Sequence, residues 1–499
     1  MGLTSASKPR QQVKELRGRL LMVSAVVVLI FLSLMGRLYV LQVKRGEEFA
    51  NMGEANFIKS QRLKHDRGMI LDRYGEILVD NRPAMNVEVT PYFLGERVKG
   101  EETLDQLFDL LDLDQEMGRE LRATIFKQRG LSSFSPIEIK RDVDWETVER
   151  IEAQRSILKL HGVEIVEDKR RTYPYGTLAA HILGYVNEID RGRLDRAKRE
   201  GNALGYQRGD AIGRSGIERV HEVELRGRDG SRQIAVDAKG VRRQRQKWLG
   251  GIDALGSKDP DAGYNIVLTV DKELQAAAEE AFDGSAGSVV AVDPDTGAIL
   301  AMVSTPAFDP NIVTGAMGPE AKRELDENIL KPWLNRPIQG LYAPGSTFKV
   351  ITALAALEEG ITTPHEEVFC PGHYRLGRRN WRCHKDSGHG HVNLKDALKL
   401  SCDTWFYQMA DRMGIDPIAE MGKKFGVGIA SGLDLPGEKR GLMPDEAFHD
   451  RVEKSTGGYQ RGMALNTSIG QGSVLMHPLQ LAMVYAALVN GGRMIEPRL

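Results

Sequence analysis

An apolar segment close to the N-terminus constrains the fold of this chain more than any other feature. Residues 20–35 carry only apolar side chains apart from two serines, and the apolar character continues past Gly36 and Arg37 to Leu41. About twenty such residues are enough for a helix that crosses the hydrocarbon core of a membrane. The long side chain of Arg37 can reach the outer interface. We therefore predict one transmembrane helix at residues 20–41.

The residues before this segment favour one orientation in the membrane. It is preceded by Lys8, Arg10, Lys14, Arg17 and Arg19. Basic residues beside a span stay on the cytoplasmic side, so we predict a cytoplasmic tail at residues 1–19 and an exported chain after about residue 42. A cleaved signal peptide is the alternative. The apolar core is not followed by a convincing small-x-small cleavage site, which favours a permanent anchor.

Composition indicates a large folded exterior. The chain has 499 residues, of which 41% are hydrophobic and 27% are charged, and this suffices for two or three domains with their own cores. The formal net charge is −1, so nothing in the charge balance points to nucleic acid. The basic run at residues 239–247 is interpreted as a solvated loop. We expect no nucleic-acid partner.

The segment from residue 42 to residue 255 is mixed and rich in charge. Residues 67–78 are typical of two strands joined by a polar turn. The spacing of apolar residues predicts helices within 101–127 and 145–160. Structural roles are expected for two titratable residues of this segment: His181 as a histidine with its hydrogen bonds satisfied, and Glu218 as a carboxylate beside a turn.

A second domain is expected to follow. The stretch at 228–262 is rich in Gly, Lys, Arg and Asp and is the expected hinge. A strand at 265–271 and a helix at 274–282 then open a domain that we assign to residues 256–499.

A serine and a lysine lie one helical turn apart in this second domain. The four residues from 346 to 349 are Ser-Thr-Phe-Lys, and Pro344 and Gly345 precede them. Such a Pro-Gly approach is typical of a helix start, so Ser346 is expected in the first turn with its side chain beside that of Lys349. A serine hydroxyl is a poor nucleophile until a base takes its proton. Lys349 is the candidate base.

Three further segments accompany this pair. Ser401 and Asp403 place a hydroxyl and a carboxylate one residue apart, and residues 466–472 read Asn-Thr-Ser-Ile-Gly-Gln-Gly. Residues 287–302 are typical of two apolar strands joined by an Asp-Pro-Asp-Thr-Gly turn. The S-x-x-K spacing alone is common in proteins, so its combination with these segments carries the assignment.

These segments together resemble the transpeptidase domain of the penicillin-binding proteins, which share S-x-x-K, S-x-N and K-T-G motifs with serine β-lactamases. The upstream sequences at 171–176, 179–186 and 213–218 are similar to the pedestal module of class B penicillin-binding proteins. The resemblance implies an α+β multidomain fold. It would comprise the transmembrane helix, an elongated mixed α/β pedestal of dimerisation type at 42–255, and a serine β-lactamase/transpeptidase-like domain at 256–499. The last would have an antiparallel sheet with helices on both sides.

The chain departs from the family pattern at two points. Asp403 stands where most of the family has Asn, which is more similar to the penicillin-binding protein 2 branch than to the division-specific branch. The K-T-G motif is absent, and the sequence stops at Leu499 directly after an Asn-Gly-Gly turn. We expect the given sequence to end inside its catalytic domain.

The resemblance implies a peptidoglycan D,D-transpeptidase of cell-wall elongation. Ser346 would attack the D-Ala-D-Ala bond of a stem peptide and form an acyl-enzyme. Ser401 would relay a proton to the leaving D-alanine, and Asp403 would order Lys349 or bind a peptide amide of the substrate. Because an ionised Asp only accepts hydrogen bonds, Asp403 near Lys349 would hold the lysine proton more tightly than Asn. The implied substrate-binding residues are Thr347, Gly470, Gln471 and Gly472.

The same resemblance implies partners and a location. β-Lactams would acylate Ser346, and a membrane-embedded glycan polymerase of the shape, elongation and division type would be a protein partner. The chain would be a single-pass protein of a bacterial inner membrane with its bulk in the periplasm. No organic cofactor is implied.

Cysteine usage predicts a metal site. The chain has three cysteines, and all lie within residues 370–402 together with four histidines. A disulfide plus one spare thiol is the alternative, but three thiols and one imidazole complete a tetrahedral zinc site. Some members of the resembling branch carry zinc in this region. The predicted structural zinc ligands are Cys370, Cys383, His389 and Cys402, with His391 or His384 in reserve as the histidine.

Two other functions stay open at this level. A D,D-carboxypeptidase or β-lactamase would share the serine chemistry and pass the acyl group to water, but it would not need the anchor and the long pedestal. A non-catalytic scaffold that activates a glycan polymerase would not need the four residues Ser346, Lys349, Ser401 and Asp403.

Overall fold

The computed structural model describes residues 8–45, 58–235 and 257–499, apart from residues 129, 131–132, 134–135, 159 and 316. The basic run at 239–247, the centre of the hinge expected at 228–262 and the start of the cytoplasmic tail lie outside the described residues. The chain forms two compact units. The first comprises residues 1–64, 84–168 and 229–260, and the second comprises residues 65–83, 169–228 and 261–499.

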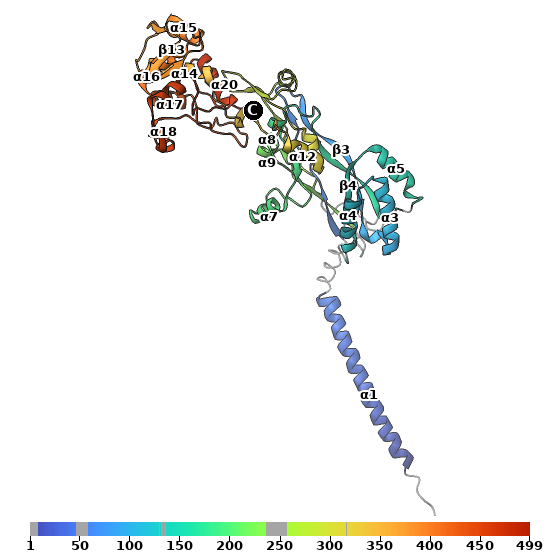
Figure 1. Cartoon of the computed structure of the whole chain (residues 1–499). Coiled ribbons are helices and arrows are strands. Elements are labelled where there is room, and N and C mark those ends of the chain that lie inside the picture. The colour runs from blue at the N-terminus through green and yellow to red at the C-terminus, as the bar shows by residue number, and fades with distance from the viewer. Residues whose placement is uncertain are drawn as a thin grey trace, which may run out of the picture. The chain divides into compact units, whose positions relative to one another are not determined.

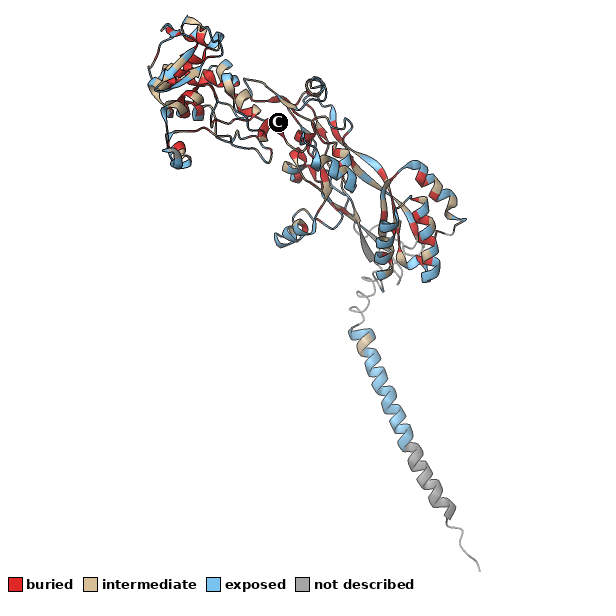
Figure 2. Ribbon diagram, in the orientation of Figure 1, coloured by how far each residue is buried: buried red, intermediate tan, exposed pale blue. Residues whose placement is uncertain are grey.

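The longest helix, α1, spans Lys8–Tyr39 and continues into a π-helical turn at Val40–Lys44. Residues Met22–Lys44 are long and apolar enough to cross a membrane. Nearly all their side chains are exposed, as Figure 2 shows along the described part of this helix. Exposed apolar surface is unfavourable in water, so hydrocarbon is the solvent that suits this helix. The predicted N-terminal apolar helix is confirmed.

The folded part of the first unit is a small sheet covered by three helices (Figure 1). Strand β3 pairs antiparallel with β4, and β5 also pairs with β3. A second ribbon is formed by antiparallel β1 and β8. The core beneath the helices includes Leu104, Leu107, Phe108 and Ile151. The elements are β1 (Ile58–Leu63), β3 (Ile77–Val89), α3 (Arg97–Leu110), α4 (Gln115–Lys127), β4 (Ile137–Val143), α5 (Trp145–Arg155), β5 (Val163–Thr172) and β8 (Gly230–Ala235).

The helical region predicted at 101–127 comprises two helices, α3 and α4. Asp112, with a φ of 49°, adopts the left-handed conformation and interrupts the helix after Leu110. The side chain of Asp114 then accepts a hydrogen bond from the backbone N–H of Met117 and starts α4. Short polar side chains favour such breaks because they replace backbone hydrogen bonds locally.

The second unit begins with short paired strands. Strand β2 (Ile70–Leu71) lies between β3 and the parallel strand β9 (Ile266–Val267), and β6 (Val186–Glu188) pairs antiparallel with β7 (Ala211–Gly213). The helices here are α6 (Ala180–Leu183), α7 (Arg191–Arg199), α8 (Gly216–Val220) and α9 (Glu222–Leu225).

The rest of the second unit contains the predicted catalytic segments. Strands β10 (Gly287–Val292) and β11 (Ile299–Thr305) form the expected antiparallel pair. Helices α10 (Lys272–Glu280) and α20 (Pro478–Val489) pack beside this pair. A helical group has Trp405 and Phe406 fully buried at its centre, and it comprises α14 (Lys349–Glu358), α16 (Asp403–Met413), α17 (Asp416–Lys424) and α19 (Arg461–Ser468).

Smaller elements surround this helical group. Strand β12 (Val368–Cys370) pairs antiparallel with β15 (Gly390–Val392). Between them in the sequence, β13 (His373–Leu376) and β14 (Arg379–Arg382) form a short antiparallel hairpin. The short helices are α11 (Pro310–Val313), α12 (Pro319–Glu327), α13 (Arg336–Gln339), α15 (Leu394–Lys399) and α18 (Glu446–Val452).

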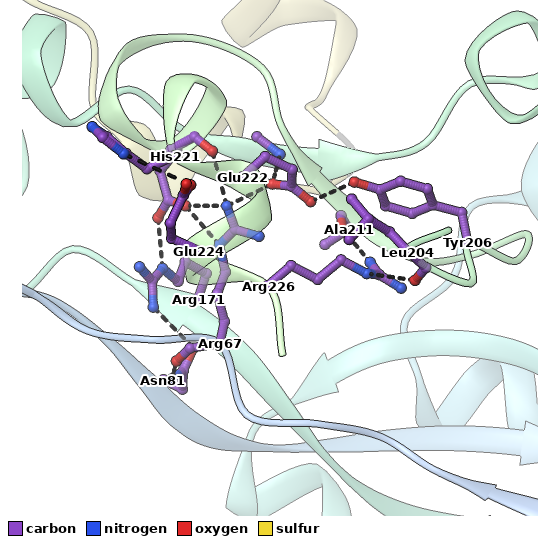
Figure 3. A network of polar contacts seen from close by, with 12 residues as sticks. Arg67, Asn81, Arg171, Leu204, Tyr206, Ala211, His221, Glu222, Glu224 and Arg226 are labelled. Carbon is purple, nitrogen blue, oxygen red and sulfur yellow. Dashed lines mark hydrogen bonds and ion pairs between the residues drawn. The ribbon is translucent and has the colours of Figure 1, made fainter. Parts of the chain in front are cut away.

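A buried network of charges holds the first part of the second unit together (Figure 3). Glu218 is fully buried and accepts hydrogen bonds from Arg171 Nε at 2.6 Å and from Arg67 Nε at 2.7 Å. Arg67 also donates to Glu222 at 2.7 Å, and Tyr206 donates to the other oxygen of Glu222 at 2.8 Å. Residues 151 positions apart in the sequence are thereby joined.

Glu218 is therefore structural, as expected, but it is a buried ion-pair partner rather than a carboxylate beside a turn. Burial alone would raise the pKa of its carboxyl group. The ion pairs with Arg171 and Arg67 outweigh this effect and hold the pKa below its ordinary value of 4.5. His181 is also structural: its Nε2 lies 2.8 Å from the carbonyl oxygen of Pro332, and burial lowers its pKa to about 4.

We predict that Glu218→Gln lowers the free energy of unfolding by about 3–5 kcal/mol, because buried Arg171 loses its counter-charge and Arg67 keeps only its ion pair with Glu222. Because the folded-state pKa of Glu218 is lowered, its stabilisation is present at neutral pH and is lost as the pH falls below about 4.5. Urea denaturation of the full-length protein in detergent, at pH 7 and pH 4, measures both effects.

The matched control is Glu324→Gln, at an exposed position of α12, where a change within about 0.5 kcal/mol is expected. An equal loss of stability in the two variants would contradict the structural role of the buried network.

Candidate active site

The predicted nucleophile lies at the start of a helix. Ser346 belongs to a 3-10 turn at Gly345–Phe348 that runs directly into α14. Its side chain is exposed, while Phe348 is fully buried and Lys349 is 2% exposed. The turn therefore presents a hydroxyl to solvent and buries a cation within one turn of helix.

The Lys349 ammonium is held by three acceptors. Its Nζ atom lies 2.8 Å from the carbonyl oxygen of Ser401, 3.0 Å from Ser401 Oγ and 2.6 Å from Asp403 Oδ1. It also lies 5.3 Å from the ring centroid of Phe406, within the range of a cation–π contact.

Ser401 connects the lysine to the nucleophile. Its Oγ atom donates to Ser346 Oγ at 3.0 Å, while it accepts from Lys349. A direct contact between Lys349 and Ser346 was expected from their helical spacing. Among the described residues, the hydrogen bond that reaches the Ser346 hydroxyl comes instead from Ser401. The three polar groups thus form a line of two hydrogen bonds.

Asp403 uses both of its oxygens within the protein. Oδ1 accepts from Lys349, and Oδ2 accepts from the backbone N–H of His384 at 2.9 Å. The sequence left two roles open for this residue, namely ordering Lys349 and binding a substrate amide. The geometry favours the first, because both carboxylate oxygens already have donors.

A strained backbone arranges the second motif. Ser401 has a φ of 52°, in the left-handed region, and Cys402 is the N-cap of α16. A non-glycine residue pays about 1–3 kcal/mol for such a conformation. The expected separation of side chains is present: Ser401 and Asp403 contact Lys349, while Cys402 points into a cluster of sulfur and imidazole groups.

Gly470 packs against the turn that carries the nucleophile. The backbone N–H of Gly345 donates to the carbonyl oxygen of Gly470 at 2.9 Å. Gly470 has a φ of 69°, and a Cβ atom there would lie 2.2 Å from the carbonyl oxygen of Gly345. Gly470 therefore supports the nucleophile turn from behind.

The other predicted substrate-binding residues lie around the same turn. Thr347 is exposed, its hydroxyl donates to the carbonyl oxygen of Pro344 at 2.6 Å, and its own carbonyl accepts from Tyr485 at 3.0 Å. Gln471 and Gly472 are exposed at the end of the 466–472 segment.

Sequence reasoning missed two groups that shape this region. Tyr485 of α20 lines a cavity of about 380 Å³ together with Thr347, Tyr342 and His477. Trp381 of β14 donates from its indole to Asn466 Oδ1 at 3.1 Å. A lone aromatic residue in an amphipathic element carries no sequence signal that would separate these roles from ordinary core packing.

The four predicted metal ligands come together. The sulfur atoms of Cys370, Cys383 and Cys402 and one nitrogen of His389 all lie within 4.8 Å of one another. His389 Nδ1 is 3.6 Å from Cys370 Sγ and 3.5 Å from Cys383 Sγ. A tetrahedral zinc ion with Zn–S of about 2.3 Å and Zn–N of about 2.0 Å separates its ligand atoms by roughly 3.5–3.8 Å. The arrangement fits such an ion.

The two reserve histidines lie outside this set. His391 is paired with Glu367 at 3.7 Å, and His384 Nδ1 lies 3.6 Å from Asp403. Burial would raise the pKa of the Cys370 thiol, but the polar groups around its sulfur, His389 among them, outweigh this effect and lower the pKa to about 6. A thiol with a low pKa is suited to metal ligation, because the thiolate is the ligand.

Comparison with known proteins gives two family matches. The profile of the Penicillin binding protein transpeptidase domain matches residues 287–499, and that of the Penicillin-binding Protein dimerisation domain matches residues 62–268. The predicted boundary between residues 255 and 256 stays a prediction, since it falls within the second of these matches.

Full-length relatives are also similar. The Peptidoglycan D,D-transpeptidase MrdA of Acinetobacter baumannii is 34% identical over 494 residues, which cover 98% of this chain and 70% of that protein. MrdA of Escherichia coli strain K12 is 34% identical over 471 residues, covering 93% of this chain and 71% of that protein.

Solved structures share the fold. PBP2 of Helicobacter pylori in complex with MreC superposes with a TM-score of 0.75 at 25% identity, covering 89% of this chain and 78% of that chain. PBP2 of Pseudomonas aeruginosa in complex with WCK 5153 gives a TM-score of 0.63 at 30% identity, covering 88% and 72%. These matches confirm the predicted mixed α/β fold with a pedestal and a transpeptidase domain. The chain belongs to the penicillin-binding protein 2 branch of the class B penicillin-binding proteins.

Proposed function

We propose that this chain is a peptidoglycan D,D-transpeptidase of cell-wall elongation that works through an acyl-enzyme at Ser346. The observation that carries the proposal is the line of hydrogen bonds from Lys349 through Ser401 to Ser346. Such a line links an exposed hydroxyl to a buried amine, which is the arrangement that serine acyl transfer needs.

The acylation step follows from this geometry. With Lys349 as the neutral amine, the two hydrogen bonds run in the opposite sense, from Ser346 to Ser401 and from Ser401 to Lys349. The proton of Ser346 Oγ then passes to Ser401 Oγ while the Ser401 proton passes to Lys349 Nζ. Ser346 Oγ then attacks the carbonyl carbon between the two terminal D-alanines. The backbone N–H of Ser346, in the first turn of a helical segment, is one of the N–H groups that lack an intrahelical acceptor and can stabilise the oxyanion.

Collapse of the tetrahedral intermediate reverses the proton path. The C–N bond to the terminal D-alanine breaks, Ser401 returns a proton to the leaving amine, and Lys349 returns one to Ser401. An amine of a neighbouring stem peptide then attacks the acyl carbonyl carbon. The ester bond to Ser346 Oγ breaks, and the proton that the amine loses passes back to Ser346 Oγ as the cross-link forms. Asp403 holds Lys349 in line throughout, since its carboxylate also stays bonded to the His384 N–H.

We predict that the full-length protein is labelled covalently by a fluorescent penicillin and that Ser346→Ala abolishes the label. β-Lactams resemble the D-Ala-D-Ala terminus, so they should acylate the same oxygen. Gel fluorescence after denaturation measures the label. Labelling that persists in Ser346→Ala would rule out this nucleophile.

The location of the chain is part of the same proposal. The helix at Met22–Lys44 could cross a membrane, and the basic residues before it favour a cytoplasmic N-terminus. We infer a single-pass anchor in a bacterial inner membrane with the bulk of the chain in the periplasm. A penicillin that cannot cross the inner membrane should therefore label the protein in spheroplasts as fully as in lysed cells.

We predict that Gly470→Ala slows penicillin acylation about 100-fold, because the new methyl group must displace the Gly345 backbone, and a shift of about 1 Å in a reacting group can cost this much. The rate of label incorporation measures the effect.

Gly360→Ala, just beyond the far end of α14, is the matched control. It also has a positive φ, of 65°, but no atom lies within 4 Å of its added Cβ. A rate within a few-fold of wild type is expected. Equal rates in the two variants would show that the Gly345 contact does not position Ser346.

We propose further that Cys370, Cys383, His389 and Cys402 hold a structural zinc ion. Four protein ligands leave no open position for water, so the ion would supply stability and no chemistry at the substrate. It would fix Cys402 between Ser401 and Asp403, and thereby restrain both of these residues.

We predict about one zinc per chain of purified protein, lost in Cys383→Ser and kept in His391→Ala, whose imidazole lies outside the cluster. Elemental analysis measures the metal. Loss of zinc should lower the melting temperature and slow acylation, because Ser401 is no longer held. A metal-free, fully active protein with a Cys370–Cys383 disulfide would overturn the site.

Partners follow from the proposed reaction. The substrates are peptidoglycan stem peptides, and β-lactams are the expected inhibitors. We propose a membrane-embedded glycan polymerase of the shape, elongation and division type as protein partner. This is supported by a similar chain in a solved structure described as a peptidoglycan synthase complex, with a TM-score of 0.66 and 29% identity, covering 97% of this chain. Co-purification of the two proteins from detergent-solubilised membranes is the expected result.

A further inference from the structure

The hairpin of β13 and β14 concentrates positive charge beside the active site. Residues 373–385 contain five Lys and Arg residues and no Asp or Glu, although the whole chain has a net charge of −1. The cations are Arg375, Arg378, Arg379, Arg382 and Lys385, and all five are exposed.

The register of the hairpin separates an inner face from an outer face. Tyr374 pairs with Trp381, and Leu376 lies on the same side because side chains alternate along a strand. All three pack against the core. The outer face therefore carries the pairs His373–Arg382 and Arg375–Asn380, whose four side chains are exposed.

Arg375 and Arg382 are diagonal neighbours on this outer face. Arg375 belongs to the pair Arg375–Asn380, and Arg382 belongs to the next pair on the same side, His373–Arg382. Diagonal positions in an antiparallel ladder are about 7–8 Å apart. Alternate residues of an extended peptide are separated by about 6.6 Å. Two guanidinium groups at this spacing can face two carboxylates on one side of an extended peptide.

Two carboxylates close to the hairpin, Asp411 and Asp403, are engaged with other groups, and Asp386 follows the basic stretch directly in the sequence. Asp411 accepts from Tyr374 OH at 2.6 Å and pairs with Arg461 at 2.6 Å. Asp403 holds Lys349, as described above. Further out, the acids form separate ion pairs, namely Glu366 with Arg412 at 2.8 Å and Glu367 with His391 at 3.7 Å.

Within the described part of the chain, no ion pair reaches the five hairpin cations. Arg375 Nε donates to the carbonyl oxygen of Gly377 at 3.2 Å, and the Arg379 guanidinium lies 5.8 Å from the Trp381 ring centroid. These contacts orient two of the side chains and leave their charge uncompensated.

The hairpin is anchored to the elements that carry the catalytic groups. Trp381 donates to Asn466 in α19, and this helix leads to Gly470, which packs against the turn that carries Ser346. Tyr407 of α16 donates to the carbonyl oxygen of Arg382 at 3.3 Å. Figure 1 shows β13 beside α16, the helix that begins with Asp403. The cations thus project from a fixed support close to Ser401.

We propose that the outer face of this hairpin, centred on Arg375 and Arg382, binds carboxylates of the acidic peptide substrate on the amino-terminal side of its D-Ala-D-Ala end. Planar guanidinium groups bind carboxylates with two parallel hydrogen bonds and hold them better than lysine would. This inference rests on the proposed transpeptidase function and adds a preference for acidic over amidated stem peptides.

The test measures equilibrium binding to the full-length Ser346→Ala protein, which cannot turn the ligand over. Two synthetic peptides ending in D-Ala-D-Ala serve as probes: one carries free carboxylates on two alternate residues before this end, and the other carries these groups as amides. The acidic peptide should bind about tenfold tighter at low salt, equivalent to about 1.4 kcal/mol, and the difference should shrink as salt is added.

In Arg375→Gln/Arg382→Gln this preference should disappear, while affinity for the amidated peptide stays within about twofold. Arg323→Gln, an exposed arginine of α12, is the charge-matched control and should keep the preference. A misfolded variant would lose both peptides equally. Equal loss of both, or an unchanged preference, overturns the proposal.

Two further arms separate this inference from its alternatives. If the wild-type protein takes up no penicillin label, the proposed function fails, whereas peptide preference in the Ser346→Ala protein is still measurable. Binding to vesicles that contain anionic lipid is tested in parallel. The double variant could bind vesicles more weakly than wild type and still keep its preference for the acidic peptide. This result would assign the outer face to contact with a membrane surface and overturn the peptide site.

Discussion

The ion pair between Lys349 and Asp403 organises three segments that are distant in the sequence. A buried ammonium is costly unless it is paired and hydrogen-bonded, and Lys349 is 2% exposed. The three groups that accept hydrogen bonds from its ammonium all come from the 401–403 motif. Asp403 in turn accepts from the His384 backbone, so the loop after the β13–β14 hairpin is tied to the same charge. The nucleophile is then placed by the helix that carries the lysine.

Backbone conformations that most side chains avoid complete this arrangement. Ser401 occupies the left-handed region, and this turn lets its hydroxyl and the Asp403 carboxylate face the lysine while Cys402 faces the opposite way. Gly470 occupies the same region and approaches Gly345 too closely for any side chain. The energetic cost of the first conformation is offset by the surrounding contacts, which a four-ligand cluster behind Cys402 would reinforce.

Local features of the fold and site were predictable, whereas long-range contacts were not. Helical spacing placed Ser346 and Lys349 on one turn, and thiol and imidazole counts identified the cluster that includes His389. The Ser401–Ser346 hydrogen bond was not expected as the link to the lysine, because it joins residues 55 positions apart. Glu218 was expected beside a turn, since nothing local reveals that Arg67 from a loop and Arg171 from β5 pair with it. Helix breaks depend on single residues, so the apolar periodicity of 101–127 did not reveal that Asp112 and Asp114 divide the region into two helices.

The two arginine-rich regions of the chain illustrate different physical rules. Arg67 and Arg171 are buried, and each has a carboxylate at 2.7 Å or closer because an unpaired buried cation would unfold its surroundings. Arg375 and Arg382 are exposed, and water solvates them at little cost. The stability of the fold therefore explains why Arg67 and Arg171 are present, but it does not explain the presence of Arg375 and Arg382. The second set is distinguished by its clustering on a hairpin whose inner face is fixed to α16 and α19. A rigid, uncompensated charge beside a nucleophile acts on the ligand that the nucleophile receives, through attraction and orientation rather than through the fold.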